Sequence, residues 1–310
     1  MKNLPPVAIT IRSFDLSGPA LKKLKENFTL SFINKTGARL SETDLIKVLE
    51  NVQGVIAGTE IFSHNVINQC SSLKVISRIG VGTDSIDLAT ARDRGIQILT
   101  TPNSPIQSVA EHTVALIFSL LKNIPLYNFN LRNGDFSLHP GFTLYGKKVG
   151  IIGLGRVGSR VATILECCGC IIHFFDPFIK KNIPHSWKRM DTLEALMADS
   201  DIITIHSTAS PLGQPLIEEK LLSNAKKGII IINTARGSLI DEHALITSLE
   251  SGKVAAAGLD VFAVEPYNGE LLKFSQVIVT PHVASNTIEA RMQMEEEAVN
   301  NLIEGLKVGQ

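Results

Sequence analysis

The feature that most constrains this chain is a glycine-rich turn between two apolar runs near its middle. The run at 149–152 leads into Gly153, Gly155 and Gly158, a helix-like stretch follows, and a second apolar run ends at Asp176. In a dinucleotide-binding unit these glycines make the tight turn, admit a pyrophosphate and let helix and strand pack closely, and an acid about 20 residues on takes the ribose hydroxyls. A glycine-rich surface turn is the alternative. The flanking strand, helix and acid favour a nucleotide-binding unit.

Length and charge limit the class of protein. The 310 residues are 44% hydrophobic, which is enough for two domains with separate cores. The 30 basic and 30 acidic side chains give zero formal net charge, so we expect neither a nucleic-acid nor a membrane-surface partner, but a small molecule. No apolar run has transmembrane length, and the start, MKNLPP, lacks the apolar core of a signal peptide. We therefore predict a cytoplasmic protein.

Cysteine spacing does not indicate a metal site. Cys70 stands alone, and Cys167, Cys168 and Cys170 crowd together before an apolar run. Zinc ligands come in pairs at wider intervals. We predict small apolar filler at these positions and no metal.

Alternating β-rich and helical stretches predict two α/β units with parallel sheets. The first has short strands at 7–11, 28–33, 54–57, 73–77 and 97–99, with a helix N-cap at Ser41. The second has continuous apolar strands at 202–205, 228–232, 255–259 and 277–280, which is typical of strands buried on both faces. The prediction is an α/β fold of two doubly wound parallel-sheet domains. A Rossmann-type NAD-binding domain at 102–286 is inserted into a smaller, flavodoxin-like substrate-binding domain at 1–101 and 287–310.

Three other segments have predicted places. The stretch 108–122 is an apolar-rich helix that we expect to be buried between domains or subunits. Residues 131–148 have no clear period and are predicted to form a loop that reaches a partner subunit. The stretch 286–307 is predicted to be a helix that packs on the first domain through Met292, Ala298, Leu302 and Leu306.

Reactive side chains follow three successive strands of the second unit. Arg236 follows 228–232, Glu265 follows 255–259 and His282 follows 277–280. Ligands of open α/β sheets bind beyond the carboxyl ends of the strands. Reduction of a 2-oxo acid needs a cation for the carboxylate, which suits arginine, and a proton donor, which suits histidine. A carboxylate beside the histidine would stabilise its imidazolium form.

Each of these residues also has an ordinary interpretation when taken alone. Arg236 could cap a helix that starts at 237–241, and His282 could be a loop histidine with satisfied hydrogen bonds. Glu265, just before Pro266, could be a turn residue. Their common position behind successive strands favours a catalytic set.

Five motifs identify a family resemblance. NTARG at 233–237, DVF at 260–262 with Glu265-Pro266, and TPHVAS at 280–285 resemble the three signatures of the D-isomer-specific 2-hydroxyacid dehydrogenases, and GVGTD at 80–84 and SVAEHT at 108–113 extend the similarity. The resemblance implies an NAD-dependent oxidoreductase that interconverts a D-2-hydroxy acid and its 2-oxo acid by hydride transfer. It also implies a homodimer, with the 108–122 helix and the following loop at the interface.

The resemblance further implies a role for each matched residue. Arg236 would hold the substrate carboxylate, His282 would be the acid/base, and Glu265 would be its partner. The implied cofactor residues are Gly153, Gly155, Arg156, Val157, Gly158, Asp176, Ser207, Thr234, Ala235, Asp260 and Ser285, with Asp260 at the nicotinamide carboxamide. The implied substrate residues are Arg78, Val81, Gly82 and Asn103, together with Arg236 and His282.

Charge around Asp176 predicts which dinucleotide binds. Its carboxylate would repel a 2′-phosphate, and the next residues, Pro177 and Phe178, supply no arginine to receive one. Lys180 and Lys181 lie a little further on. NAD is therefore the expected cofactor.

The substrate is less constrained than the family. Segments 78–88 and 101–103 resemble the D-3-phosphoglycerate dehydrogenases of the family, and Arg78 could meet a substrate phosphate or pair with a structural acid. Gly58 and Leu138 stand where those enzymes tend to carry further basic contacts. No regulatory domain follows the last helix, so serine feedback through one is not expected. Glyoxylate or hydroxypyruvate reduction is the alternative activity. An NAD(H)-sensing, corepressor-like binding protein is the alternative of another class, but it would not need the catalytic set.

Overall fold

The computed structural model describes residues 4–179, 183–208 and 213–307. The chain forms two compact units, which we call unit 1 (Met1–Pro105 with Asn286–Gln310) and unit 2 (Ile106–Ser285). The chain passes from unit 1 to unit 2 after residue 105, whereas the predicted boundary follows residue 101. It returns to unit 1 after residue 285, whereas the predicted boundary follows residue 286.

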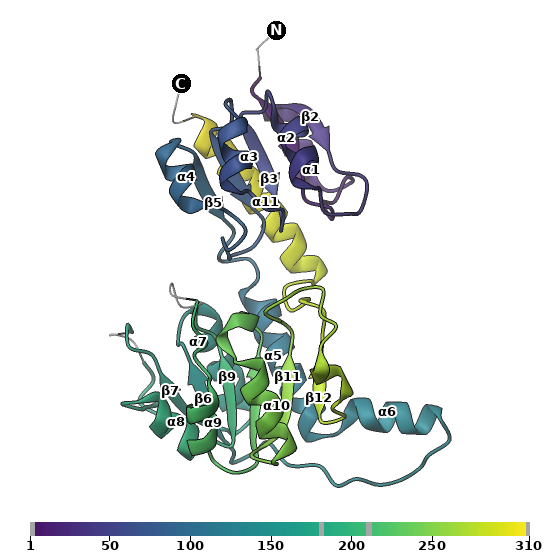
Figure 1. The fold of residues 1–310 in the computed structure, drawn as a ribbon, viewed down its shortest axis with the longest axis vertical. Coiled ribbons are helices and arrows are strands. Elements are labelled where there is room, and N and C mark those ends of the chain that lie inside the picture. Colours follow the sequence, from purple (N-terminus) through teal and green to yellow (C-terminus); the bar gives the residue numbers. More distant parts are fainter. Residues whose placement is uncertain (1–3, 180–182, 209–212, 308–310) are drawn as a thin grey trace. The chain divides into compact units, whose positions relative to one another are not determined.

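Unit 1 is a parallel α/β sandwich. Its described strands form a sheet in the order β2-β1-β3-β4-β5, and every neighbouring pair is parallel. Helices on both faces bury an apolar sheet, which is the flavodoxin-like arrangement. The strands are β1 (Pro6–Ile9), β2 (Thr29–Ile33), β3 (Gly54–Ala57), β4 (Val75–Arg78) and β5 (Gln97–Thr100). One face carries α1 (Pro19–Asn27) and α11 (Ile288–Lys307), and the other carries α2 (Glu42–Leu49), α3 (His64–Gln69) and α4 (Leu88–Asp93) (Figure 1).

The last helix returns to unit 1, as expected. α11 contacts α1, β3, β4 and β5, and Ala298, Leu302 and Leu306 lie in the core. The prediction for Met292 was wrong, because its side chain is 49% exposed whereas Met294 is buried. Counting back four residues from Ala298 reaches Met294, so residue 292 falls on the other side of the helix.

Unit 2 is a larger sandwich of the same kind. In the described part of the chain, its parallel sheet has the order β12-β11-β10-β9-β6-β7-β8. The strands are β6 (Lys148–Ile152), β7 (Ile171–Phe175), β8 (Lys188–Arg189), β9 (Ile202–Ile205), β10 (Ile229–Asn233), β11 (Val254–Leu259) and β12 (Val277–Val279). One face carries α8 (Leu193–Asp199), α9 (Glu219–Asn224) and α10 (Glu242–Glu250), and the other carries α5 (Ile106–Leu121) and α7 (Arg156–Cys167). Two short 3-10 turns follow strands, η1 (Gly237–Leu239) and η2 (Glu270–Lys273). The predicted fold class, two doubly wound parallel-sheet domains, is confirmed.

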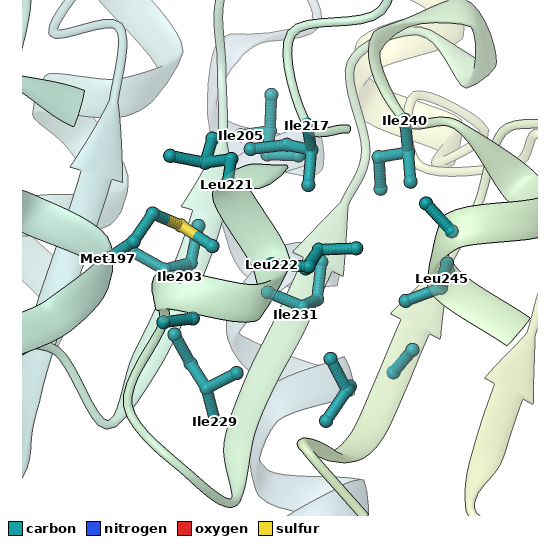
Figure 2. Close-up of a cluster of buried hydrophobic side chains, with 14 of the residues drawn as sticks. Met197, Ile203, Ile205, Ile217, Leu221, Leu222, Ile229, Ile231, Ile240 and Leu245 are labelled. Carbon is teal, nitrogen blue, oxygen red and sulfur yellow. The ribbon is translucent and has the colours of Figure 1, made fainter. Parts of the chain in front are cut away.

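Buried isoleucines of β9 and β10 form much of the core on one face of this sheet. Figure 2 shows Ile203 and Ile205 of β9 and Ile229 and Ile231 of β10 packed against Met197 of α8, with leucines of α9 and α10 beside them. All of these isoleucines are fully buried. Apolar side chains on both faces of β9 and β10 explain why these strands read as continuous apolar runs.

The segment after α5 differs from the prediction. A helix, α6 (Ile124–Arg132), precedes the expected loop, and residues 133–147, all described, contain neither helix nor strand. α6, whose residues are likewise all described, buries no side chain. Figure 1 shows α6 and the following segment extending away from the sheet of unit 2. Its exposed apolar side chains are Ile124, Phe129, Leu131, Phe136, Leu138, Phe142 and Tyr145.

α5 itself packs into unit 2. It contacts α7, β10 and β11 and contributes Ala110, Ile117 and Leu121 to the core. Its expected burial between domains or subunits stays a prediction. Within the described ranges no single helix is long and apolar enough to cross a membrane, and the one pair that reaches that length and composition, α5 with α6, is bent by 60°.

Candidate active site

The three reactive side chains follow adjacent strands of unit 2. Arg236 follows β10, Glu265 follows β11 and His282 follows β12, and these strands are parallel neighbours. Their carboxyl ends therefore lie at one edge of the sheet. A backbone hydrogen bond of 2.9 Å from Asp260 N to Asn233 O ties the first two loops together where the strands end.

His282 and Glu265 form a hydrogen-bonded pair. Nδ1 of His282 lies 2.8 Å from Oε2 of Glu265, and Oε1 of Glu265 accepts the amide of Phe262 at 3.1 Å. A carboxylate only accepts hydrogen bonds, so Nδ1 carries the proton of this pair and Nε2 takes no part in it. The imidazole is 46% exposed, and His282 has φ of 55°, a left-handed backbone that non-glycine residues rarely adopt. Backbone strain of this kind gathers at functional sites.

The turn that carries Arg236 packs tightly against the next loop. Nη1 of Arg236 donates to Ala235 O at 2.7 Å. The buried side-chain amide of Asn233 holds the turn, because it donates to Arg236 O at 2.8 Å and accepts from Ala235 N at 3.0 Å. A Cβ added to Gly237 would lie 1.9 Å from the carbonyl carbon of Phe262. Any side chain at 237 would push the arginine turn away from the loop that carries the glutamate.

Asp260 is the buried anchor of the His282 loop. Its side chain is fully buried, Oδ1 accepts from Thr280 Oγ1 at 2.5 Å and Val283 N at 2.9 Å, and Oδ2 accepts from Ala284 N at 2.9 Å. Its carbonyl accepts the amide of His282 at 2.8 Å. The sequence predicts a cofactor contact for Asp260. That contact stays a prediction, because the carboxylate here is covered and supports the loop.

The glycine-rich turn has the geometry that a dinucleotide needs. Gly153 has φ of 85°, and a Cβ on Gly158 would lie 2.1 Å from Gly153 O, so both positions require glycine. α7 begins at Arg156, with Gly155 as its N-cap. No described atom beyond its chain neighbours lies within 4 Å of a Cβ placed on Gly155, so the helix N-terminus is open to an anion.

Asp176 links this turn to the end of β7. Its Oδ2 accepts from Leu154 N at 2.8 Å, and its Oδ1 accepts from Phe178 N at 2.8 Å and Ile179 N at 3.1 Å. Arg189 of β8 donates to Asp176 O at 2.8 Å. Spacing along the chain does not reveal this arginine, which comes close to Asp176 through the pairing of β8 with β7. Lys180 and Lys181 lie outside the described residues.

The other predicted cofactor residues line neighbouring loops. The Ser207 hydroxyl, after β9, is buried and has no hydrogen-bond partner among the described residues, which is the state of a group that a ligand satisfies. Thr234 is buried and its hydroxyl contacts Thr113 Oγ1 at 2.8 Å. Val157, Ala235 and Ser285 are half-buried. The open helix N-terminus, the carboxylate at the end of β7 and the unsatisfied hydroxyl fit a bound dinucleotide.

Comparison with known proteins decides the family. Residues 114–284 match the sequence model of the D-isomer specific 2-hydroxyacid dehydrogenase NAD binding domain, which is more than half of the chain. The chain belongs to the D-isomer specific 2-hydroxyacid dehydrogenase family. Unit 2 accordingly contains the family's NAD-binding domain.

Individual relatives place the chain within this family. It is 36% identical over 249 residues to the D-3-phosphoglycerate dehydrogenase of Bacillus subtilis (strain 168), a match of 79% of this chain and 47% of that protein. The chain spans about half the length of the curated relatives that it matches. Among solved structures, the TT0316 protein of Thermus thermophilus is similar with a TM-score of 0.87 and 31% identity, over 98% of this chain and 97% of that one. An NADPH-dependent glyoxylate/hydroxypyruvate reductase of Sinorhizobium meliloti, in complex with NADP and malonate, has a TM-score of 0.87 and 28% identity, over 99% and 95%.

The predicted substrate residues of unit 1 lie at the carboxyl edge of its own sheet. Arg78 ends β4 and donates through Nη1 to Ile79 O at 2.7 Å. The following turn, with Val81 and Gly82, is fixed because Gly80 N donates to Thr101 Oγ1 at 2.7 Å and Thr101 N donates to Gly80 O at 3.0 Å. Asn103 lies two residues beyond Thr101. These residues are therefore brought together within unit 1.

A buried acid near Arg78 was missed by the sequence analysis. Glu60 is buried and its Oε2 accepts from Gly58 N at 2.6 Å. Burial raises the pKa of Glu60, while backbone N–H groups and the positive charges of Arg39 and Arg78 act in the opposite direction. The structural acid considered as an alternative partner of Arg78 is therefore present, and no local pattern around Glu60 reveals it.

Two of the four cysteines are buried. Cys70 and Cys170 are buried, and this burial raises the pKa of Cys70 to about 11 and of Cys170 to about 12, as expected of unreactive filler. Cys167 is exposed, so the filler prediction was wrong there. Among the described residues, no group of three or more His, Cys, Asp or Glu is arranged to hold a metal ion.

Glu60→Gln tests the buried charge through stability. Between the ordinary glutamate pKa and the raised native pKa, the native state binds more protons than the unfolded chain, so stability falls as pH rises through this window. The variant keeps the acceptor for Gly58 N but loses the charge. We expect its thermal midpoint at about pH 8 to exceed that of the wild type, with the difference shrinking toward about pH 4.5. The exposed Glu26→Gln is the matched control, and equal pH slopes for wild type and Glu60→Gln would contradict the assignment.

Proposed function

We propose that this chain is an NAD-dependent oxidoreductase that interconverts a D-2-hydroxy acid and its 2-oxo acid. The observation that carries the proposal is the His282–Glu265 pair, held at the same sheet edge as Arg236. Membership in the dehydrogenase family supports it. In this proposal unit 2 binds the cofactor and unit 1 contributes to substrate binding.

The proposed mechanism assigns one task to each side chain. The nicotinamide ring of bound NAD supplies the hydride donor or acceptor. In reduction, the protonated His282 donates its Nε2 proton to the substrate oxygen, and in oxidation the neutral ring takes that proton back. Glu265 holds Nδ1–H, which fixes the ring and stabilises its charged form.

Arg236 is proposed to bind the substrate carboxylate. A guanidinium matches a carboxylate with two parallel hydrogen bonds, which fixes the angle of the adjoining carbonyl as well as its place. The fixed turn between Asn233 and Gly237 holds this side chain at the sheet edge. Contacts of Arg78, Val81, Gly82 and Asn103 with the substrate remain part of the same proposal.

We propose D-3-phosphoglycerate as the substrate, and hence the first step of serine biosynthesis. The name of the Bacillus subtilis relative supports this, and Arg78 is a cation suited to a phosphate. Gly58 and Leu138 bring no further cations, and the Sinorhizobium meliloti structure is a glyoxylate/hydroxypyruvate reductase, so that activity is the second candidate. An NAD(H)-sensing binding protein is less well supported, because Arg236, Glu265 and His282 are all retained.

Assays with 3-phosphoglycerate, hydroxypyruvate, glyoxylate and pyruvate test the function, with His282→Ala as the decisive variant. We expect turnover of at least one of these acids by the wild type, and a loss of roughly 10²–10⁴-fold in the variant with NADH affinity nearly unchanged, because the ring acts on the substrate oxygen. His243→Ala, on the exposed side of α10, is the control. Full turnover by His282→Ala would refute the role.

Asp176 is proposed to select NAD over NADP. Asp176→Ala should weaken NADH binding and reduce the ratio of the affinity for NADH to that for NADPH, since it removes the charge that repels a 2′-phosphate. Asp176→Asn, which keeps one acceptor oxygen for Phe178 N and Ile179 N, separates charge from loop support. Fluorescence titration with both reduced cofactors measures the preference. An unchanged ratio of affinities in both variants would show that Asp176 does not discriminate.

We also propose a homodimer, in which α6 and residues 133–147 meet a partner. Phe129, Phe136 and Leu138 are exposed there, and so many large apolar side chains on one segment mark an association surface. Sedimentation equilibrium should give twice the mass of one chain, and Phe136→Asp with Leu138→Asp should shift it toward the monomer. A monomeric wild type would rule out this use of the segment. The expected cytoplasmic location remains a proposal.

A further inference from the structure

Three polar side chains of helix α5 contact loops that follow strands of unit 2. Ser108 and Thr113 are buried and His112 is half-buried, although none of them belongs to the catalytic set. Residues 108 and 112 lie one helical turn apart on one side of the helix, and residue 113 lies about 100° around the helix from residue 112. Polar groups on a buried helix side need hydrogen-bond partners.

Apart from an intrahelical bond from Thr113 Oγ1 to Val109 O at 2.8 Å, their partners belong to the loops that carry the catalytic set. Ser108 Oγ donates to Ala284 O at 2.6 Å, and His112 Nε2 lies 3.0 Å from Thr280 Oγ1. Thr113 Oγ1 contacts Thr234 Oγ1, two residues before Arg236, at 2.8 Å. One helix therefore supports both the His282 loop and the Arg236 turn.

The direction of each proton in this network follows from its chemistry. The carboxylate of Asp260 can only accept, so the single hydroxyl proton of Thr280 goes to Oδ1 at 2.5 Å. The oxygen of Thr280 must then accept from His112, which places a proton on Nε2. The same Nε2 lies 3.5 Å from Asp260 Oδ1. The donors run from His112 through Thr280 to the buried carboxylate.

That carboxylate is the anchor of the His282 loop. A fully buried negative charge is costly unless hydrogen bonds and nearby positive dipoles offset the loss of water. Its described donors are Thr280 Oγ1, Val283 N and Ala284 N, and the Asp260 carbonyl takes the His282 amide. Removing the outermost donor would leave the Thr280 hydroxyl without the partner that orients it.

We propose that His112 is a positioning residue for His282, acting through Thr280 and Asp260, with Ser108 and Thr113 completing the support of both loops from α5. The inference rests on the proposed function, because it assumes that His282 is the acid/base. His112 touches neither substrate nor cofactor in this proposal. It acts by keeping the left-handed His282 backbone in place.

The first test compares His112→Leu with His112→Gln. Leucine removes the N–H group, whereas glutamine places an amide N–H near the position of Nε2. We expect kcat to fall by about 10–100-fold in His112→Leu, as for a small misplacement of a catalytic group, with unchanged NADH affinity. His112→Gln should recover kcat to within a few-fold of the wild type. A glutamine variant as impaired as the leucine variant would overturn the role of the N–H group.

Hydrogen–deuterium exchange of the peptide that covers residues 280–285 gives a readout besides activity. The amides of His282, Val283 and Ala284 should exchange faster in His112→Leu than in the wild type, and His112→Gln should restore their protection. The peptide covering α10 serves as the control. If no oxo acid is turned over by the wild type, the proposed function fails while this measurement still decides the positioning role. Wild-type protection in His112→Leu would overturn it.

Thr280→Val provides a second route that does not alter α5. It should reproduce the faster exchange and the fall in kcat, and the double variant with His112→Leu should add little to either single change, because both interrupt one donor chain. Fully additive effects would show that His112 acts independently of Thr280. Thr280→Val by itself keeps the test decisive if His112→Leu fails to fold.

Discussion

The whole arrangement depends on the parallel register of the unit 2 sheet. β9 and β10 are buried on both faces, and each buried isoleucine contributes about 1.5–3 kcal/mol relative to an exposed one. Helices cover both faces of these strands, so each strand is held where its side chains pack closely. Because every strand runs the same way, every strand end meets the same edge. Short loops after neighbouring strands can therefore bring reactive side chains together without further structure of their own.

The charged groups at this edge divide the work between stability and reactivity. Asp260 is buried and saturated with donors, so it holds the loop, whereas the Glu265–His282 pair is partly exposed. An exposed ion pair contributes little to folding, with a median of about 0–1 kcal/mol. The pair is better understood as a means of fixing one tautomer. The buried Asp260 makes the His282 loop rigid, whereas the partly exposed Glu265 leaves His282 accessible to solvent.

Much of this could be predicted from the sequence where the signal is local. The turn at Gly153 to Gly158, the isoleucine strands and the partner of His282 all follow from spacing along the chain. The period of α11 was misjudged at Met292, and α6, whose apolar side chains include the exposed Ile124, Phe129 and Leu131, was not predicted.

Contacts between distant segments carry no such local signal. His112 meets Thr280 across 168 residues, and the raised pKa of Glu60 depends on a fold around it. Arg189 reaches Asp176 only because β8 pairs with β7. Spacing predicts which residue types gather at a sheet edge, but not which of them become supports and which stay accessible.

The carboxylate of Asp176 has a consequence for redesign of cofactor preference. It accepts three backbone amides, one of them from the phosphate-binding turn and two from the chain just beyond β7. The carboxylate that is proposed to contact the adenosine ribose therefore also holds two loops together. A variant with a small neutral residue at 176, designed to admit the phosphorylated dinucleotide, must supply another hydrogen-bond acceptor for those amides. Without one, the two loops lose this connection and the affinity for both dinucleotides falls.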